Sequence, residues 1–413
     1  MKVLVISNNC FSNTQNMGKT LSSIFSSFSR EEVCQLYFYS SIPDGNCCSD
    51  FYRVSDYDLV KGRRGGEVAP QTDQPLYENE RVQQTYARVN RSNPLISFAR
   101  TFLWGLGRWN SAAIHRWIRK MNPDLIFFAS GDTVFSYKIV ERLRRKYRLP
   151  VISYICDDFY HAEPKGILAK AYLRLLKRWM HRVFSASAVL ATICDSLGEV
   201  YSGIFGVGHT VIHTGTKLQP SKSVEKSRNI AYLGNVSLNR WQSLIQLGEA
   251  LERYNRVHGT DHLLEIYTGA QEEEILNAFG KCPAIRFCGR ISYEQCVQVM
   301  HRSVAVVHTE SFAPEDILRV KYSVSTKIAD SLACGTCFFA YGSEELASIQ
   351  YLQKHGAAVV ATQSSQLEEK LEKLFDPQIR EQTVAQALKL AAQNHIAEKN
   401  SAAFYQLCKE KVR

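Results

Sequence analysis

The chain has 413 residues, 45% of them apolar and 22% charged, which is enough apolar sequence for a sizeable core and a length typical of about two domains. The absence of any uncharged apolar run of roughly 18 residues excludes an ordinary transmembrane helix. The opening MKVLVIS lacks a signal-peptide cleavage pattern, so we expect a cytoplasmic protein.

The positive charge lies almost entirely in the first half of the chain. Residues 1–205 contain 27 Lys and Arg against 18 Asp and Glu, whereas the remainder is close to neutral. Such an excess favours an anionic partner, either a membrane leaflet or a nucleic acid. Because no nucleic-acid-binding motif accompanies it, we expect no nucleic-acid partner and rank that hypothesis last.

Twelve cysteines are scattered along the chain, several of them within apolar runs, as small core residues are. Cys334 and Cys337 form a C-x-x-C motif, which can be redox-active or half of a zinc site. No second C-x-x-C and no Cys/His pair with ligand spacing accompanies it. We therefore predict reduced thiols and no metal site.

Strand-like apolar runs alternate with helical patterns through the first half, as in a parallel sheet covered on both faces. The segment 41–93 fits neither pattern and is predicted to be a long loop or insertion. The predicted strands are 2–7, 33–40, 123–130, 150–156 and 188–194. The predicted helices are 18–28, 96–120, 133–147, 165–184 and 196–205.

The same rhythm restarts after a polar stretch, which indicates a second domain of the same α/β class. Its predicted strands are 229–235, 263–269, 284–290, 303–309, 336–342 and 357–362, with helices at 240–255, 271–279, 292–301 and 325–334. We place the first domain at 1–205 and the second at 206–385. A C-terminal helix at 386–413 could cross back to the first domain.

Two places in the first domain carry candidate chemistry, because ligands bind at the carboxyl ends of parallel strands. Gly18 opens a helix whose free N–H groups could face a phosphate or sugar oxygen of a donor, although an ordinary polar connection explains it equally well. Asp157, Asp158 and His161 follow the strand 150–156 and could position an acceptor hydroxyl. The alternative is that one aspartate caps the next helix.

In the second domain, Gly234 and Asn235 follow a strand and Arg240 begins a helix. A guanidinium at that position can bind a diphosphate through two hydrogen bonds, although an isolated arginine is more often a solvated surface residue. Glu310 similarly stands just past the strand 303–309.

The stretch STKIADSLACG, residues 325–335, predicts a helix that begins with Ser325 or Thr326 as its N-cap. Lys327 would attract phosphate in the first turn, together with Thr326. Asp330 lies three residues further on the same face and could accept two ribose hydroxyls. The alternative interpretation is a surface ion pair between Lys327 and Asp330.

The helix 165–184 has Lys170, Arg174 and Arg178 at helical spacing, opposite an apolar side of Leu168, Leu175, Leu176, Met180 and Val183. Tryptophans alternate with basic residues in 98–120. These patterns suit an anionic membrane surface. An ordinary amphipathic helix that packs on the core explains each segment equally well.

These segments together resemble the retaining glycosyltransferases of family 4, which have the GT-B fold. The resemblance covers nearly the whole chain and rests on KVLVIS with MGKT, ATICDSLGEVYSGIFG with VIHTG, NIAYLGN, and STKIADSLACG. It implies two Rossmann-like doubly wound domains that face each other across a cleft, with C-terminal helices. The first domain would bind the acceptor and the second the nucleotide-sugar donor.

The resemblance also implies roles for single residues. Arg240 matches the residue that binds the donor diphosphate, Asp330 the acid that contacts the ribose, and Glu310 the acid that contacts the donor sugar. In the family two glutamates are separated by seven residues, whereas Glu310 precedes Asp330 by twenty. An insertion of about twelve residues, 311–322, reconciles the spacings. Glu315 and Lys321 remain alternatives to Glu310.

We therefore predict a glycosyltransferase that transfers a sugar from a nucleotide-diphosphate sugar with retention of configuration. Arg240 and Lys327 would stabilise the leaving diphosphate without a metal, and Asp157 or Asp158 would orient the acceptor. The resemblance makes a lipid-linked or polysaccharide-precursor acceptor at the inner face of a membrane plausible. The alternatives are an inactive partner subunit, a nucleotide-sugar epimerase and a phosphorylase.

Overall fold

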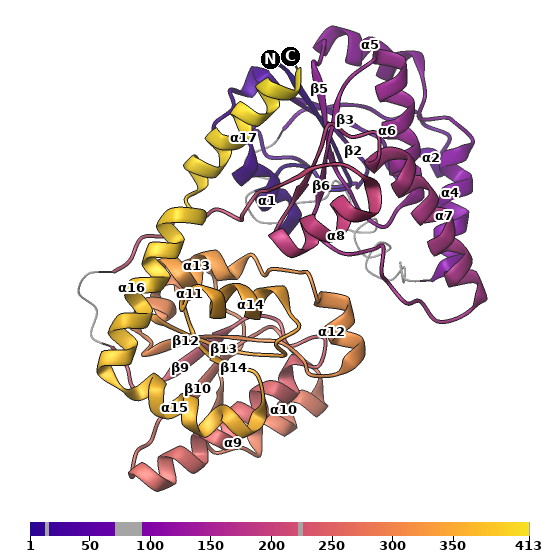
Figure 1. Ribbon diagram of the computed structural model, residues 1–413. Helices are drawn as coiled ribbons and strands as arrows, with labels where there is room; N and C mark the ends of the chain where they lie inside the picture. The colour runs from indigo at the N-terminus through magenta and orange to yellow at the C-terminus, as the bar shows by residue number, and fades with distance from the viewer. Residues whose placement is uncertain (13–15, 71–92, 222–225, 413) are drawn as a thin grey trace. The chain divides into compact units, whose positions relative to one another are not determined.

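The computed structural model describes residues 1–12, 16–70, 93–221 and 226–412 (Figure 1). The chain divides into two compact units. Unit 1 comprises Met1–Thr214 together with Ala397–Arg413, and unit 2 comprises Gly215–Ile396. The sequence had placed these boundaries at 205 and 385. The first boundary falls later because residues 209–211 form the last strand of the unit 1 sheet.

Unit 1 is built on one eight-stranded sheet with the order β4-β3-β2-β1-β5-β6-β7-β8. Every neighbouring pair is parallel except β3 and β4. The strands are β1 (Val3–Ser7), β2 (Val33–Tyr37), β3 (Asp50–Arg53), β4 (Gly66–Val68), β5 (Leu125–Ala129), β6 (Val151–Ile155), β7 (Val189–Thr192) and β8 (His209–Val211). The order reverses between β1 and β5, which makes the sheet doubly wound.

Helices cover this sheet on both faces, so its central strands are buried along their whole length. All residues of β1, β2, β5 and β6 are buried, which is why these segments are mainly apolar, with single polar residues such as Gln35. The helices are α1 (Asn16–Ile24), α2 (Asp56–Val60), α4 (Pro94–Gly105), α5 (Ala112–Met121), α6 (Val134–Tyr147), α7 (Ile167–Phe184) and α8 (Asp195–Phe205).

The last helix, α17 (Ala397–Val412), completes unit 1 by packing on α1. The Ser401 hydroxyl accepts from the backbone N–H of Ser27 at 2.8 Å and donates to the carbonyl of Ile24 at 2.7 Å. The ring of Phe404 packs edge-on against those of Phe25 and Phe127. The end of the chain is therefore part of the core of unit 1.

Unit 2 has a six-stranded, fully parallel sheet with the order β11-β10-β9-β12-β13-β14. Numbered within the unit, this order is 3-2-1-4-5-6, which is that of the Rossmann fold. The strands are β9 (Ile230–Leu233), β10 (Leu264–Tyr267), β11 (Ile285–Phe287), β12 (Ala305–Thr309), β13 (Cys337–Tyr341) and β14 (Val359–Ala361).

Two apolar clusters hold the helices of unit 2 on opposite faces of the sheet (Figure 1). One cluster joins the sheet to α9, α10 and α15, and the other joins it to α11, α13, α14 and α16. The helices are α9 (Arg240–His258), α10 (Glu273–Gly280), α11 (Tyr293–Arg302), α12 (Pro314–Val320), α13 (Lys327–Ala333), α14 (Ala347–Lys354), α15 (Leu367–Phe375) and α16 (Pro377–Asn394). The predicted α/β class with two doubly wound domains is confirmed.

Several local predictions were wrong. The segment 41–93 is not a plain loop, because its described part contains β3, α2 and β4. The expected helix 96–120 is two helices, α4 and α5, and the chain between them turns at Gly107 with φ +74°. The helices α12 and α14 were not predicted. Within the described residues, no helix has the length and apolar character needed to span a membrane.

Candidate functional site

A pocket of about 160 Å³ lies in unit 2, where the strand order reverses between β9 and β12. In a doubly wound sheet this switch point is where ligands bind. The carboxyl ends of the two strands contribute Tyr232 and Leu233 on one side and His308 to Glu310 on the other. The first residues of α9, α11 and α13 close the pocket.

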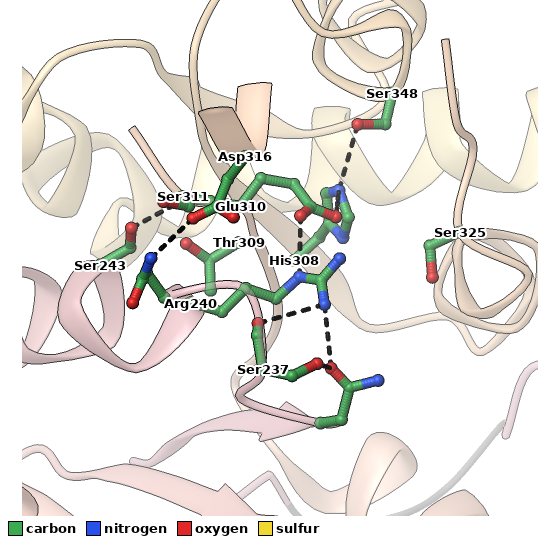
Figure 2. A network of polar contacts seen from close by, with 12 residues as sticks. Ser237, Arg240, Ser243, His308, Thr309, Glu310, Ser311, Asp316, Ser325 and Ser348 are labelled. Carbon is green, nitrogen blue, oxygen red and sulfur yellow. Dashed lines mark hydrogen bonds and ion pairs between the residues drawn. The ribbon is translucent and has the colours of Figure 1, made fainter. Parts of the chain in front are cut away.

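Arg240, the first residue of α9, extends into this pocket toward Glu310 (Figure 2). Its Nε donates to Oε2 of Glu310 at 2.7 Å, and its Nη1 donates to Oδ1 of Asn235 at 2.9 Å. Burial opposes the charge of Arg240, but the neighbouring Glu310 outweighs it and leaves the arginine pKa raised. The guanidinium is therefore firmly held.

Glu310 is the acid at the centre of the site, as its position after β12 indicated. It is 6% exposed, and its Oε1 lies 3.8 Å from Nε2 of His308. Burial lowers the pKa of His308 and so favours a neutral imidazole beside the ion pair. Neither alternative to Glu310 lines the pocket, because Glu315 is exposed on α12 and Lys321 lies 3.3 Å from Glu345.

Lys327, the first residue of α13, brings a second cation to the same pocket. The residue is exposed, but a Cβ at Gly234 would lie only 3.1 Å from its Nζ and 2.9 Å from Oη of Tyr232. Glycine at 234 therefore leaves room for the ammonium. Within the described residues the Lys327 ammonium makes no hydrogen bond or ion pair. Burial, and then the charge of Arg240, lower its pKa.

Asp330, one turn further along α13, also lines the pocket, but its carboxylate is already engaged. One oxygen accepts from the hydroxyl of Thr216, and the other accepts from the hydroxyl of Tyr293 at 3.3 Å. Burial, and then Asp330, raise the pKa of Tyr293 to about 12, so its hydroxyl remains protonated. The carboxylate thus holds two hydroxyl groups, the arrangement expected for a ribose, but both come from the protein.

The predicted N-cap of α13 is only partly as expected. Thr326 occupies the N-cap position without a capping hydrogen bond from its side chain, and it does not line the pocket. Ser325 lines the pocket instead, and its Oγ lies 3.4 Å from the backbone nitrogen of Lys327. The interpretation of Lys327 and Asp330 as a surface ion pair is wrong, because no such pair forms.

The site residues predicted in the first domain belong to unit 1. Gly18 lies within α1, where a Cβ would come 2.7 Å from the carbonyl oxygen of Cys10, so glycine allows the helix to pack on that segment. Asp157 is exposed after β6. Asp158 accepts from Oη of Tyr201 and from Nδ1 of His161, each at 2.9 Å. No helix begins until Ile167, so Asp158 organises a turn and does not cap a helix.

The basic helix 165–184 forms as α7, with Lys170, Arg174 and Arg178 exposed. Its buried face contains Leu176, Met180 and Val183, as predicted. Leu168 was assigned to that apolar side but is 48% exposed. The apolar surface of this helix therefore extends beyond the core contact.

Sequence reasoning missed several pocket residues, notably Tyr293, Cys296 and His308. The only signal for His308 was its place at the end of an apolar strand, two residues before Glu310. Tyr293 and Cys296 reach the pocket from α11, whose approach depends on tertiary packing. Within the ranges that the structure describes, no group of three or more His, Cys, Asp or Glu side chains is arranged to hold a metal ion.

Residues 240–406 match a protein family described as glycosyl transferase-like. No curated protein matches the chain. Among solved structures, HepE from Anabaena in complex with UDP is similar at 14% identity and a TM-score of 0.64, over 99% of this chain and 100% of that one. Sucrose-phosphate synthase from Thermosynechococcus elongatus is similar at 11% identity and a TM-score of 0.65, over 99% of each chain.

A UDP-forming trehalose-phosphate synthase from Burkholderia vietnamiensis matches at 9% identity and a TM-score of 0.62, over 100% of this chain and 97% of that one. At such low identity the likeness concerns the fold. Because each of these proteins is matched along nearly its whole length, the likeness extends over both units. The chain has the GT-B fold of two Rossmann-like domains, as its strand orders indicate.

Proposed function

We propose that the protein is a glycosyltransferase whose nucleotide-diphosphate sugar donor binds in the pocket of unit 2. The observation that carries the proposal is the presence of two cationic side chains, Arg240 and Lys327, in one small pocket at the switch point of the sheet. A pyrophosphate carries at least two negative charges and matches that pair. HepE has been solved with UDP and with UDP-glucose, so uridine is the first base to test.

In this proposal the diphosphate is the leaving group, and the two cations stabilise the charge that develops on it as the sugar is transferred. Arg240 is fixed in place by Glu310 and Asn235, whereas Lys327 is free to bind a phosphate oxygen. We include independence of metal in the proposal, because the two side chains supply the charge that a cation would. Retention of configuration is included because of the resemblance to the retaining glycosyltransferases of family 4.

Glu310 and Asp330 would select the two ends of the donor. Glu310 lies beside Arg240 and would receive hydroxyls of the transferred sugar. Asp330 would bind the ribose once its hydroxyls replace those of Thr216 and Tyr293. Gly234 and Asn235 would border the diphosphate, because Gly234 leaves room for the Lys327 ammonium and Asn235 accepts from Arg240. Thr326, the N-cap of α13, could contribute only through its backbone at the start of that helix.

The acceptor would bind to unit 1, where Asp157, Asp158 and His161 follow β6. We propose a lipid-linked or polysaccharide-precursor acceptor and attachment to the inner face of a membrane. The exposed cations Lys170, Arg174 and Arg178 support the attachment, since such residues attract anionic lipid.

A second candidate is an inactive glycosyltransferase-like partner subunit. It is favoured by Asp330, because both of its oxygens are already satisfied by protein hydroxyls. The two candidates differ in one measurable property. An active enzyme releases a nucleoside diphosphate, whereas an inactive subunit does not.

The proposal is tested with Lys327→Ala and with Lys354→Ala as a matched control on an exposed lysine of unit 2. Loss of one preorganised charge at the leaving group should lower kcat by roughly 10²–10³-fold. UDP at 100 times its Kd should stabilise the parent protein by about 2.7 kcal/mol, and Lys327→Ala should lose most of this. Turnover close to normal in Lys327→Ala, with unchanged circular dichroism, would contradict the assignment.

A further inference from the structure

The insertion between Glu310 and α13 contains a buried acid that the proposed reaction has not used. Residues 314–320 of this insertion form α12, and Asp316 in its first turn is 6% exposed. Its neighbour Glu315 is exposed. A buried carboxylate costs several kcal/mol of desolvation unless a polar partner compensates it. The partner that Asp316 has is therefore informative.

That partner lies directly before Arg240. Oδ2 of Asp316 accepts from Nδ2 of Asn239 at 2.8 Å. Asn239 is the N-cap residue of α9, yet its side chain makes no capping hydrogen bond to that helix. Its amide is directed to the insertion instead.

The backbone at this point is strained. Leu238 has φ +55° and Asn239 has φ +51°, so two successive residues other than glycine adopt the left-handed conformation just before α9. Asparagine tolerates this conformation, whereas leucine adopts it only under strain. Such a turn persists only where the surrounding structure holds it, and it sets the direction in which the chain enters α9.

We propose that Asp316 is a positioning residue for Arg240, acting through Asn239. The charged hydrogen bond holds Asn239 in the left-handed turn, and the turn directs the next residue into the pocket, with its Nε 2.7 Å from Glu310. This role rests on the proposed function, because Arg240 matters only if the pocket binds an anion. The insertion would thus preorganise the donor site from outside the pocket lining.

The first test follows Arg240 in the protein without ligand. Its Nε–Hε resonance, assigned by its loss in Arg240→Lys, should exchange slowly with solvent because it donates to Glu310. Asp316→Ala should speed this exchange at least about tenfold. Asp316→Asn, whose amide oxygen still accepts from Asn239, should restore most of the protection, and Glu315→Ala should change nothing. Unchanged exchange in Asp316→Ala would overturn the proposal.

The second test is a double-mutant cycle on UDP affinity. Asn239→Gly keeps the left-handed turn accessible but removes the amide. Asp316→Ala should weaken UDP binding about tenfold in the parent chain and less than twofold in the Asn239→Gly background. An equal loss in both backgrounds would show that Asp316 does not act through Asn239. If Asp316→Ala fails to fold, Asn239→Gly alone should show the faster exchange, and normal exchange there overturns the proposal.

Failure of this inference is distinguishable from failure of the proposed function. If the parent protein binds no nucleoside diphosphate, or Arg240→Ala binds UDP as well as the parent does, the donor site is wrong. The exchange experiment still decides whether Asp316 positions Arg240, because it uses no ligand.

Discussion

At the residue scale, the pocket of unit 2 is defined by an imbalance of charge. Glu310 balances Arg240 at 2.7 Å, while the ammonium of Lys327 has no hydrogen bond or ion pair among the residues that the structure describes. Desolvation and the charge of Arg240 both oppose the ammonium of Lys327, so an anion that enters the pocket would offset them. This is why the site suits a diphosphate better than a neutral sugar.

The same imbalance predicts how affinity depends on pH. Burial and Arg240 lower the pKa of Lys327. In the free protein the ammonium of Lys327 therefore loses its proton at a pH below the usual lysine pKa near 10.4. A bound diphosphate raises the pKa again, which links binding to protonation. The Kd for UDP should be flat below the lowered pKa and rise about tenfold per pH unit above it. Calorimetric titration between about pH 7 and 10 measures this.

Lys327→Arg is the matched control. Arginine does not titrate in this pH range, so the Kd of this variant for UDP should not change with pH. The stability of the free protein changes with pH in the opposite direction to its affinity for UDP. Between the lowered pKa and the ordinary one, the unfolded chain holds more protons than the folded chain, so the free protein should become more stable as the pH rises. Parallel profiles for the parent and Lys327→Arg would rule out Lys327 as the titrating group.

At the element scale, the sequence predicted the parts of the fold that are buried on both faces. The strands β1, β5, β6 and β13 are continuous apolar runs because helices cover them on both sides. The short elements β3, α2 and β4 escaped prediction, since three to five residues give no clear period. The place of β3 in the sheet comes from pairing with β2, and that of β4 from pairing with β3; the first of these is a tertiary contact.

The residues of the candidate site also divide into those that the local sequence predicts and those that depend on tertiary contacts. Arg240, Glu310 and Lys327 could be found because each directly follows a strand or begins a helix at the carboxyl edge of the sheet. Asp316 and Tyr293 could not be found in this way. Asp316 lies in an insertion whose folding back on α9 is not encoded in any local pattern, and Tyr293 reaches Asp330 only through the packing of α11.

Packing of α1 gives a prediction at this scale. A methyl group at Gly18 would meet backbone atoms of Cys10 and Ser12 at 2.7–2.9 Å, and backbone moves less readily than a side chain. Gly18→Ala should therefore destabilise unit 1 by about 1–3 kcal/mol, less the gain of up to about 1 kcal/mol in helix propensity. Thermal unfolding followed by circular dichroism should show a lower Tm for the unit 1 transition.

Gly203→Ala in α8 is the control, because nothing lies within 4 Å of the added methyl group and the substitution should be neutral or stabilising. Since Gly18 was first predicted to bind the donor, UDP binding is measured in parallel. An unchanged Tm together with lost UDP affinity would make Gly18 a binding residue and contradict the packing explanation.

At the scale of the whole molecule, apolar and basic side chains are exposed on neighbouring helices of unit 1. Of the eight exposed large apolar side chains in its described residues, seven lie on α2, on α4 or its C-cap, and at the start of α7. These are Tyr57, Val60, Leu95, Phe102, Leu106, Ile167 and Leu168. The helix α4 packs against both α2 and α7, and neither α4 nor α7 contains an acidic residue.

This combination fits the headgroup region of an anionic bilayer, where apolar side chains insert and cations remain at the phosphates. Each basic residue near such a surface contributes about 1 kcal/mol. Replacing Lys170, Arg174 and Arg178 together by alanine should therefore weaken binding to anionic vesicles by roughly 100-fold. Co-sedimentation with vesicles of phosphatidylglycerol and phosphatidylcholine measures the affinity, and added salt should reduce it.

Two comparisons separate the apolar from the electrostatic contribution. Phe102→Ser, at a side chain 70% exposed, should weaken vesicle binding, whereas Val257→Ser, at a similarly exposed position of unit 2, should leave it unchanged. The triple alanine variant of Lys281, Lys354 and Lys389 removes the same charge from unit 2 and should bind like the parent. If it loses as much affinity as the α7 variant, net charge alone drives binding and no defined membrane face exists on unit 1.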